Sequence, residues 1–398
     1  MSQNWIVGFS IKFYGAFILL SLLGNFIIHY NSLHIYTILC ISIYVYTFVL
    51  GTTLGSSTPA VKLSNILVSP YRLIKWLLII SVIAVVLGWL ALIRYYGSLT
   101  EIFLHAFDVR TETIGDGVQL VPTYITYPGS LVYAAFAIAA VSFHYYKDKS
   151  FIKKALILGV IIVLTDLQAF GRIGILFAIF IIGGYVLLYL NNFNLRKLIL
   201  PSSLLLVILM LPRWIRGGSS FEGIGDRYTQ YTTFPIPEFF APFLSIYAYY
   251  FSGIYALNEI LIQDCSDFAF GQRNFASILN FLNRVFTDGD ISHRLVIIGD
   301  LVYVPFDTNI FTIIGEIYMD FGLLGLVLLP LFFGYCIGYL FKYSGLYADA
   351  LKLVLIAWIF YTPIYNAFSF GGFLISFAFL VFLTIFAESD VDFEEEMI

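Results

Sequence analysis

The chain has 398 residues, of which 60% are hydrophobic and only 12% are charged. A soluble domain carries roughly 25% charged residues, so this chain lacks the polar side chains that would cover a water-facing surface. Its formal net charge is -4, and no basic stripe is present, which argues against a nucleic-acid partner. The apolar runs are too many and too long for one buried core, and in a bilayer such runs form helices.

The apolar runs predict an all-α polytopic membrane protein with about ten transmembrane helices. Each run is close to the ~20 residues that a helix needs to cross the hydrocarbon core. The expected spans cover residues 13–30, 34–52, 73–93, 124–143, 155–169, 173–190, 197–212, 321–341, 350–366 and 370–387. No repeat or linker interrupts the sequence, so we expect a single integral membrane domain over residues 1–398.

The stretch from Lys154 to Leu190 is apolar but too long for one crossing. A helix rises ~1.5 Å per residue, and the hydrocarbon core is only ~30 Å thick. The middle of the stretch reads Asp166-Leu-Gln-Ala-Phe-Gly-Arg172, which contains polar residues and a glycine. We therefore expect two short spans, with Arg172 at the turn between them.

The placement of lysine predicts the orientation of the chain. In the ten-span scheme all lysines lie on one side or at the helix ends facing it, and the positive-inside rule assigns that side to the cytoplasm. Both termini are then cytoplasmic. The segment 213–320 becomes the largest piece on the opposite, outer side, where we expect short or amphipathic helices.

Residues 239–258 leave the number of spans open, because they carry no charge and could cross the membrane. This crossing alone would give eleven spans, and the further crossing that must follow it would give twelve. The prolines Pro235, Pro237 and Pro242 favour a helix that lies in the interface or in a protein-lined cavity.

Arginine has the opposite distribution to lysine, and most arginines fall on the outer side. A guanidinium group presents a planar fork of donors that matches phosphate and carboxylate oxygens two at a time. We interpret the set as binding a phosphate, a pyrophosphate or an anionic sugar. The proposed substrate-binding arginines are Arg172, Arg213, Arg216, Arg273 and Arg294. For any single arginine the alternative is pairing with a nearby carboxylate, such as Asp166 for Arg172.

A family resemblance lies in the stretch from Thr308 to Gly325, which reads TNIFTIIGEIYMDFGLLG. It resembles the O-antigen polymerase (Wzy-type) family of oligosaccharide repeat-unit polymerases, whose members show an N-x-[FY]-T stretch, a Tyr and D-F-G-x-x-G leading into a membrane helix. The Gly171-Arg172 turn between short helices and the tyrosines from Tyr247 to Tyr255 also resemble that family.

The resemblance implies a metal-independent glycosyltransferase of the bacterial inner membrane that acts on its periplasmic face. Such an enzyme transfers a glycan from undecaprenyl diphosphate to the sugar of a second lipid-linked repeat unit. Its expected partners are the lipid-linked glycan as donor and acceptor, the bilayer and a chain-length regulator protein. The alternatives are an O-antigen ligase and a lipid-linked oligosaccharide flippase, although a transporter would more readily show paired repeats.

Glycosyl transfer also needs a base that accepts the proton of the acceptor hydroxyl. His293 is one candidate, because an unperturbed imidazole titrates near physiological pH, although it equally fits an exposed loop. Glu316 and Asp320 are its rivals, since residues four apart share one face of a helix. The alternative for Asp320 is a cap on the helix that follows.

Asn309 and Thr312 either bond sugar hydroxyls or begin the short helix that carries the two carboxylates. We expect no cofactor and no metal, because no histidine cluster suggests zinc. The Asp288-Gly289-Asp290 stretch matches the D-x-D pattern of nucleotide-sugar transferases, but Asp-Gly is also a common turn.

Overall fold

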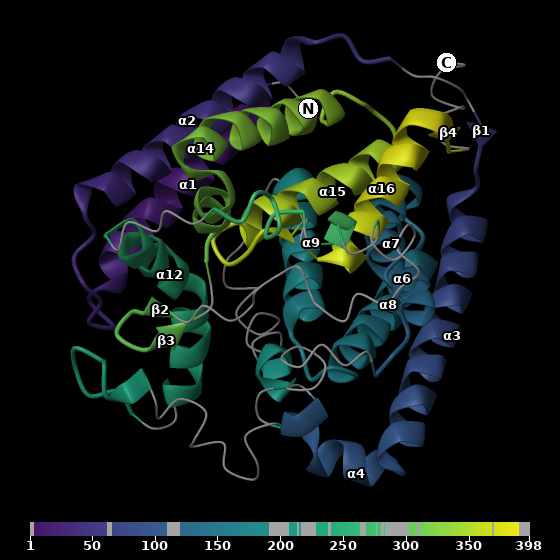
Figure 1. Cartoon of the computed structure of the whole chain (residues 1–398). Coiled ribbons are helices and arrows are strands. Elements are labelled where there is room, and N and C mark those ends of the chain that lie inside the picture. The colour runs from purple at the N-terminus through teal and green to yellow at the C-terminus, as the bar shows by residue number, and fades with distance from the viewer. Residues whose placement is uncertain are drawn as a thin grey trace. The chain divides into compact units, whose positions relative to one another are not determined.

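The structure is a computed structural model, and helices dominate it (Figure 1). It describes residues 4–61, 66–109, 120–190, 207–212, 215, 228–237, 240–262, 268–275, 277–279, 282, 302–308, 311–367 and 370–389. The chain forms two compact units, each built from segments that are distant in the sequence. Unit 1 comprises Met1–Ala60, Ser220–Lys342 and Ile359–Phe370, and unit 2 comprises Val61–Ser219, Tyr343–Trp358 and Gly371–Ile398.

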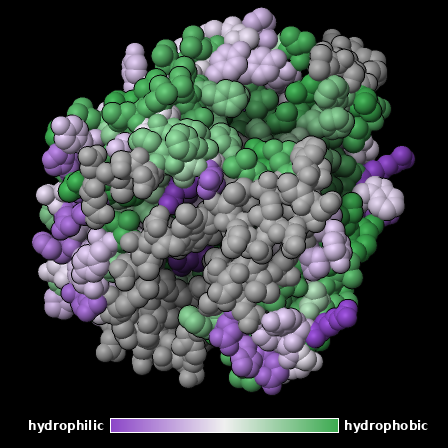
Figure 2. All heavy atoms as spheres, in the orientation of Figure 1, coloured by the Kyte–Doolittle hydropathy of each residue, from purple (hydrophilic) through white to green (hydrophobic). Residues whose placement is uncertain are grey.

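Several helices have the length and composition of membrane spans, as an all-α membrane protein requires. Among the described residues, five are long and apolar enough to cross a bilayer: Trp5–Gly24, Ile35–Ser57, Pro70–Tyr96, Tyr124–Tyr146 and Ile313–Leu340. Two shorter apolar helices are α9 (Ile173–Tyr189) and α16 (Gly371–Phe386). Apolar side chains cover much of the surface along α2 (Ile35–Ser57) and α14 (Ile313–Leu340), and contact of this surface with water would be unfavourable (Figure 2).

The predicted break between Asp166 and Arg172 is confirmed. Helix α8 covers Lys149–Leu167, and α9 begins at Ile173. The prediction of a first span over residues 13–30 is wrong at both ends, because α1 covers Asn4–Gly24. Beyond α1 the backbone amide of Tyr30 donates a 2.9 Å hydrogen bond to Oδ1 of Asn25, so polar side chains of this segment support a loop and not a helix.

The structure has a helix in each remaining described span, but two begin earlier than predicted: α8 begins at Lys149 and not at 155, and α14 (Ile313–Leu340) begins at Ile313 and not at 321. One further span is divided. Residues expected as the span 124–143 form α6 (Thr123–Gly129) and α7 (Val132–Tyr146). Pro128 lies in the last turn of α6, and its missing amide proton weakens a continuous helix there. Helix α15 covers Leu346–Tyr361. Of the predicted span 197–212, only residues 207–212 are described.

Unit 1 is organised around α2 (Ile35–Ser57) and α14 (Ile313–Leu340), which run side by side (Figure 1). Gly51 and Gly55 face the backbone of α14, and Gly334 and Gly338 face the backbone of α2. A Cβ atom added to Gly55 would lie 2.0 Å from the carbonyl oxygen of Tyr335, and one added to Gly338 would lie 2.1 Å from that of Thr52. Each helix therefore contributes a G-x-x-x-G pair that allows the two backbones to approach closely.

The uncharged stretch 239–258 is mostly helical. It belongs to α12 (Ala241–Ile262), which contacts α1, α2 and α14 of unit 1. It also contacts the hairpin of β2 (Val302–Tyr303) and β3 (Asp307–Thr308), which pair antiparallel. This hairpin, within the predicted outer segment 213–320, is a small departure from a purely helical chain.

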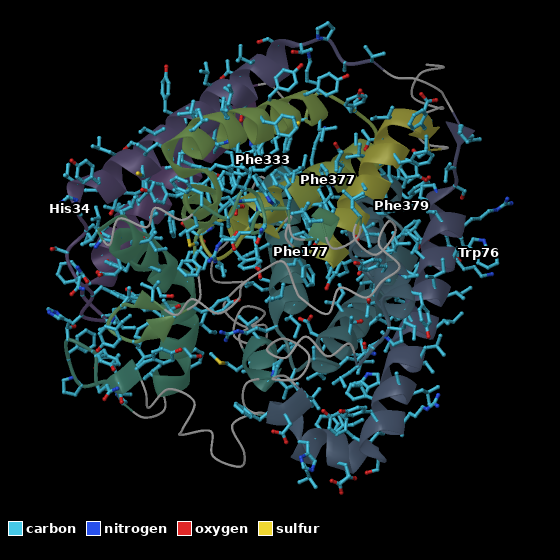
Figure 3. All side chains as sticks on the ribbon, in the orientation of Figure 1. His34, Trp76, Phe177, Phe333, Phe377 and Phe379 are labelled. Atoms are coloured by element: carbon cyan, nitrogen blue, oxygen red, sulfur yellow. The ribbon has the colours of Figure 1, made fainter. Side chains whose placement is uncertain are left out.

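Unit 2 contains α3 (Pro70–Tyr96), α4 (Leu99–Leu104) and the helices α6 to α9, together with α16. Strand β1 (Ile66–Leu67) pairs parallel with β4 (Ala387–Glu388), which ties the start of α3 to the end of α16. Trp76 is 62% exposed and points away from α3 (Figure 3), near the basic residues Arg72 and Lys75. A tryptophan beside basic residues at a helix end is typical of a membrane interface.

Candidate functional site

The most polar buried cluster that we identify in unit 1 lies at the start of α14. Thr312 is the N-cap residue of this helix, and its Oγ1 accepts a 3.1 Å hydrogen bond from the amide of Gly315. Of the two predicted roles for Thr312, the structure shows the one in which it begins the helix. Asn309 lies outside the described residues.

Asp320 is fully buried on the first segment of α14 and holds a separate piece of chain in place. Its Oδ1 accepts a 3.1 Å hydrogen bond from the amide of Arg273. Its Oδ2 accepts bonds of 2.8 and 2.7 Å from the amide and the side-chain Nδ2 of Asn274. The alternative in which Asp320 caps the following helix is wrong, because both of its oxygens bind the segment at 273–274.

The local conformation explains why Asp-Phe-Gly is needed here. Helix α14 kinks at Gly322, whose φ is 60° and ψ is -151°. A side chain would be strained in that conformation, and a Cβ atom would lie 2.9 Å from the ring of Phe268. The kink leaves the carbonyls of Met319 and Asp320 to accept hydrogen bonds from the amides of Ala269 (2.9 Å) and Phe270 (3.0 Å). The motif therefore binds residues 269–274 against the helix.

Glu316 lies one helical turn before Asp320 and is 4% exposed. Its Oε2 accepts a 2.9 Å hydrogen bond from the amide of Asn366. The side-chain Nδ2 of Asn366 donates in turn to Oδ1 of Asn274 at 2.7 Å. Glu316, Asn366, Asn274 and Asp320 thus form one buried network that joins three distant segments of the chain.

Arg273 brings a positive charge to this network. Its backbone amide binds Asp320, and its guanidinium carbon lies 5.7 Å from the centre of the Phe311 ring. Arg273 is half-buried, so its charge is partly shielded from bulk water. The structure therefore brings Arg273, from a distant segment, to the part of α14 that begins after Thr312 and carries Glu316 and Asp320, the pair predicted to share one helix face.

Asn274 and Asn366 are two members of the network that sequence reasoning missed. Both are fully buried. Asn366 stands alone in an apolar stretch, and a polar residue in such a position requires a partner, which is a signal that could have identified it. Asn274 follows Arg273 in a polar stretch and carries no comparable signal.

In unit 2, the turn that carries Arg172 is fixed by its neighbours. The carboxylate of Asp166 accepts hydrogen bonds from the amides of Gly174 (3.2 Å) and Ile175 (2.7 Å), so it caps α9. Nε2 of Gln168 donates to the carbonyl of Val85 at 2.8 Å. Arg172 itself is only 9% exposed.

Phe170, in the same turn, has a strained backbone conformation and a well-packed ring. Its φ of 43° is in the left-handed region, which a bulky residue adopts only when its surroundings compensate. Its ring is fully buried in a cluster with Leu92, Ile102 and Leu167. The position of the Arg172 backbone is therefore set by hydrogen bonds and by packing together.

The other predicted site residues, Arg213, Arg216, His293 and Arg294, lie outside the described residues. Within the described part of the chain, no group of three or more His, Cys, Asp or Glu residues could hold a metal ion. Comparison with models of protein families, with curated proteins and with solved structures found no match to this chain.

Proposed function

We propose that the chain is a glycosyltransferase of the bacterial inner membrane that polymerises lipid-linked oligosaccharide repeat units. It transfers a glycan from undecaprenyl diphosphate to a hydroxyl of a second lipid-linked unit and releases undecaprenyl diphosphate. The proposal includes about ten spans, cytoplasmic termini, a periplasmic segment 213–320 and a chain-length regulator as partner.

The observation that carries this proposal is the cluster of the half-buried Arg273 with the buried Glu316 and Asp320 at the start of an apolar helix. Glycosyl transfer from a diphosphate needs positive charge near the leaving group and a base near the acceptor hydroxyl. Arg273 and Glu316 are of the required types. The bond from Asn366 fixes the Glu316 carboxylate, and the bond to Asp320 fixes the backbone of Arg273, before substrate arrives.

Within the cluster, Glu316 is better suited than Asp320 to act as the base. Both oxygens of Asp320 accept hydrogen bonds, from the amides at 273 and 274 and from the Asn274 side chain. For Glu316, the described residues provide a hydrogen bond to Oε2 only. Its Oε1 is left to accept the proton of an acceptor hydroxyl.

The reaction can then be written in balanced form. The acceptor oxygen bonds to the anomeric carbon of the donor sugar while its proton passes to Oε1 of Glu316. The bond from the anomeric carbon to the phosphate oxygen breaks, and its electron pair leaves with undecaprenyl diphosphate. The guanidinium of Arg273 stabilises the charge that develops on the leaving diphosphate.

The lysine at the other end of α14 supports a periplasmic position for the cluster. Nζ of Lys342 donates a 2.5 Å hydrogen bond to the carbonyl of Thr58, just beyond α2. By the positive-inside rule this end of the helix pair faces the cytoplasm. The opposite end of α14, with Thr312 and Glu316, then faces the periplasm.

Arg172 is proposed to bind the diphosphate of the lipid carrier. Diphosphate binding is also proposed for Arg213, Arg216 and Arg294. The support for Arg172 is its burial together with the hydrogen bonds and packing that fix its turn. A guanidinium in apolar surroundings costs about 2.5–3.5 kcal/mol on insertion scales, so its retention points to a function.

A deletion strain of the source bacterium tests the proposal, with surface polysaccharide separated by size. We expect a single repeat unit in the deletion strain, and a full ladder after complementation with the wild-type gene. Complementation with Glu316→Gln should leave the single unit, whereas the exposed control Glu101→Gln should restore the ladder. Loss of all attached glycan would indicate a ligase, and repeat units retained on the cytoplasmic leaflet would indicate a flippase.

A further inference from the structure

A polar hollow opens in unit 1 where the loop between α1 and α2 meets the last turns of α12. Its volume is about 600 Å³, and residues 31–35 line one wall while Asn258, Glu259 and Ile262 line the other. His34, at the start of α2, marks this place in Figure 3. None of these residues belongs to the carboxylate network described above.

Asn258 forms the fully buried floor of the hollow and joins its two walls. Its Oδ1 accepts hydrogen bonds from the amide of His34 at 2.6 Å and from Oγ1 of Thr37 at 2.7 Å. Among the described residues, its Nδ2 donates a long bond of 3.5 Å to the carbonyl of Ser32. Because the side chain is fully buried, Asn258 holds the two walls of the hollow together and does not itself reach a ligand.

Glu259 and Asn31 form a second polar pair at the rim. Nδ2 of Asn31 donates a 3.0 Å hydrogen bond to Oε1 of Glu259. The described residues give Oε2 of Glu259 no hydrogen bond, so this oxygen can accept one from a ligand. Ile35 and Ile262, which are 60% and 55% exposed, provide apolar surface beside these groups.

This combination of groups favours a neutral saccharide over a phosphate. A sugar hydroxyl is both donor and acceptor, so it can bind an acidic acceptor and an amide donor at once. The ring carbons of a sugar can cover the isoleucine side chains. A phosphate would be repelled by the Glu259 carboxylate, and none of the residues that line the hollow is a lysine or an arginine.

Helix α12 connects this hollow to the carboxylate network within unit 1. Oγ of Ser252 lies 3.3 Å from Oγ1 of Thr308, and a Cβ atom at Gly253 would lie 3.0 Å from the amide nitrogen of Thr312. From Gly253 to Glu259 the axis of a helix advances by about 9 Å.

We infer that the hollow lined by Asn31, Asn258 and Glu259 is a saccharide-binding subsite that holds a neutral sugar of the repeat unit. The inference rests on the proposed function, because that function supplies the glycan that the subsite binds. A hydroxyl of the bound sugar donates a hydrogen bond to Glu259, and the sugar accepts a hydrogen bond from the side-chain amide of Asn31. The subsite sets which repeat unit the protein accepts.

The test uses the full-length protein in phosphatidylcholine nanodiscs. The probe is the free repeat-unit oligosaccharide, released by mild acid from the lipid carrier of the source bacterium and titrated by saturation-transfer NMR. The double variant Asn31→Ala/Glu259→Ala should bind about tenfold more weakly than wild type, because two hydrogen bonds are lost. Both residues lie on the rim, and the exposed control Glu101→Gln, which leaves the hollow intact, should bind as wild type does.

Equal affinity of the double variant and the wild type would overturn the inference, as would the absence of any oligosaccharide binding to the wild type. Preferential binding of inorganic pyrophosphate, lost in the same double variant, would show a phosphate site instead. The experiments can contradict one proposal without contradicting the other. If deletion leaves the polysaccharide ladder unchanged, the polymerase proposal fails, whereas the oligosaccharide titration still decides the subsite.

Discussion

The backbone amide of Asn366 donates a 2.9 Å hydrogen bond to Oε2 of Glu316, and both residues are buried. The donor is a main-chain group on a separate segment, so the position of the carboxylate is fixed by the fold of the backbone. One oxygen of Glu316 is thereby fixed, and the other is left for chemistry. This relationship is the basis for assigning Glu316 as the base.

Glu316→Gln should abolish polymerisation and leave the fold intact. A glutamine oxygen can still accept from Asn366, but it cannot take up the proton of the acceptor hydroxyl. We expect turnover of lipid-linked repeat units to fall by about 10²–10⁴-fold, the usual contribution of a positioned general base. If Glu316→Gln retains full turnover and His293→Ala loses it, the base is His293.

Asp320→Ala should destabilise the protein. The amides of Arg273 and Asn274 and the side chain of Asn274 would each lose a buried acceptor. We expect a loss of about 3 kcal/mol or more in the free energy of unfolding, since each unpaired buried donor costs roughly 1–3 kcal/mol. Thermal unfolding in detergent measures the change, and an unaltered melting temperature would show that residues 269–274 are held by other contacts.

Gly338→Ala should weaken the packing of α2 against α14. The added Cβ would lie 2.1 Å from the carbonyl oxygen of Thr52, so one helix must move. Overpacking of this kind costs about 1–3 kcal/mol. Gly15→Ala in α1 is the matched control, because no atom lies within 4 Å of its added Cβ. Similar melting temperatures for the two variants would contradict the close approach of the two helices.

Arg172→Ala should stop chain elongation without lowering the amount of protein in the membrane. Arg172→Lys should restore little elongation, because an ammonium group lacks the planar fork that binds two phosphate oxygens. Polysaccharide length and immunoblots of the membrane fraction, compared with wild type, measure the two effects. Long polysaccharide in cells that carry Arg172→Ala would remove this arginine from the proposed diphosphate-binding set.

The sequence predicts those parts of the fold that depend on local signals. The break at 166–172 follows from the length limit on a membrane helix and from its polar residues, and α8 and α9 confirm it. The pairing of α2 with α14 was not predicted. Each G-x-x-x-G pair can be seen in the sequence, but a single pair does not identify its partner helix.

The sequence predicts only part of the candidate site, because the rest depends on contacts between distant segments of the chain. Glu316 and Asp320 are recognisable because they lie four residues apart on one helix. The contribution of Arg273, Asn274 and Asn366 depends on loops that return to α14 from 40 or more residues away in the chain. Such contacts are tertiary, and no local pattern specifies them.

The most direct test of the central claim uses purified protein in proteoliposomes that contain the lipid-linked repeat unit, with the products identified by mass spectrometry. We predict that the wild type forms dimeric and longer glycans and releases one undecaprenyl diphosphate for each bond formed, whereas Glu316→Gln forms neither. Wild-type protein that leaves the repeat unit unjoined, or that only moves it across the bilayer, would contradict a polymerase.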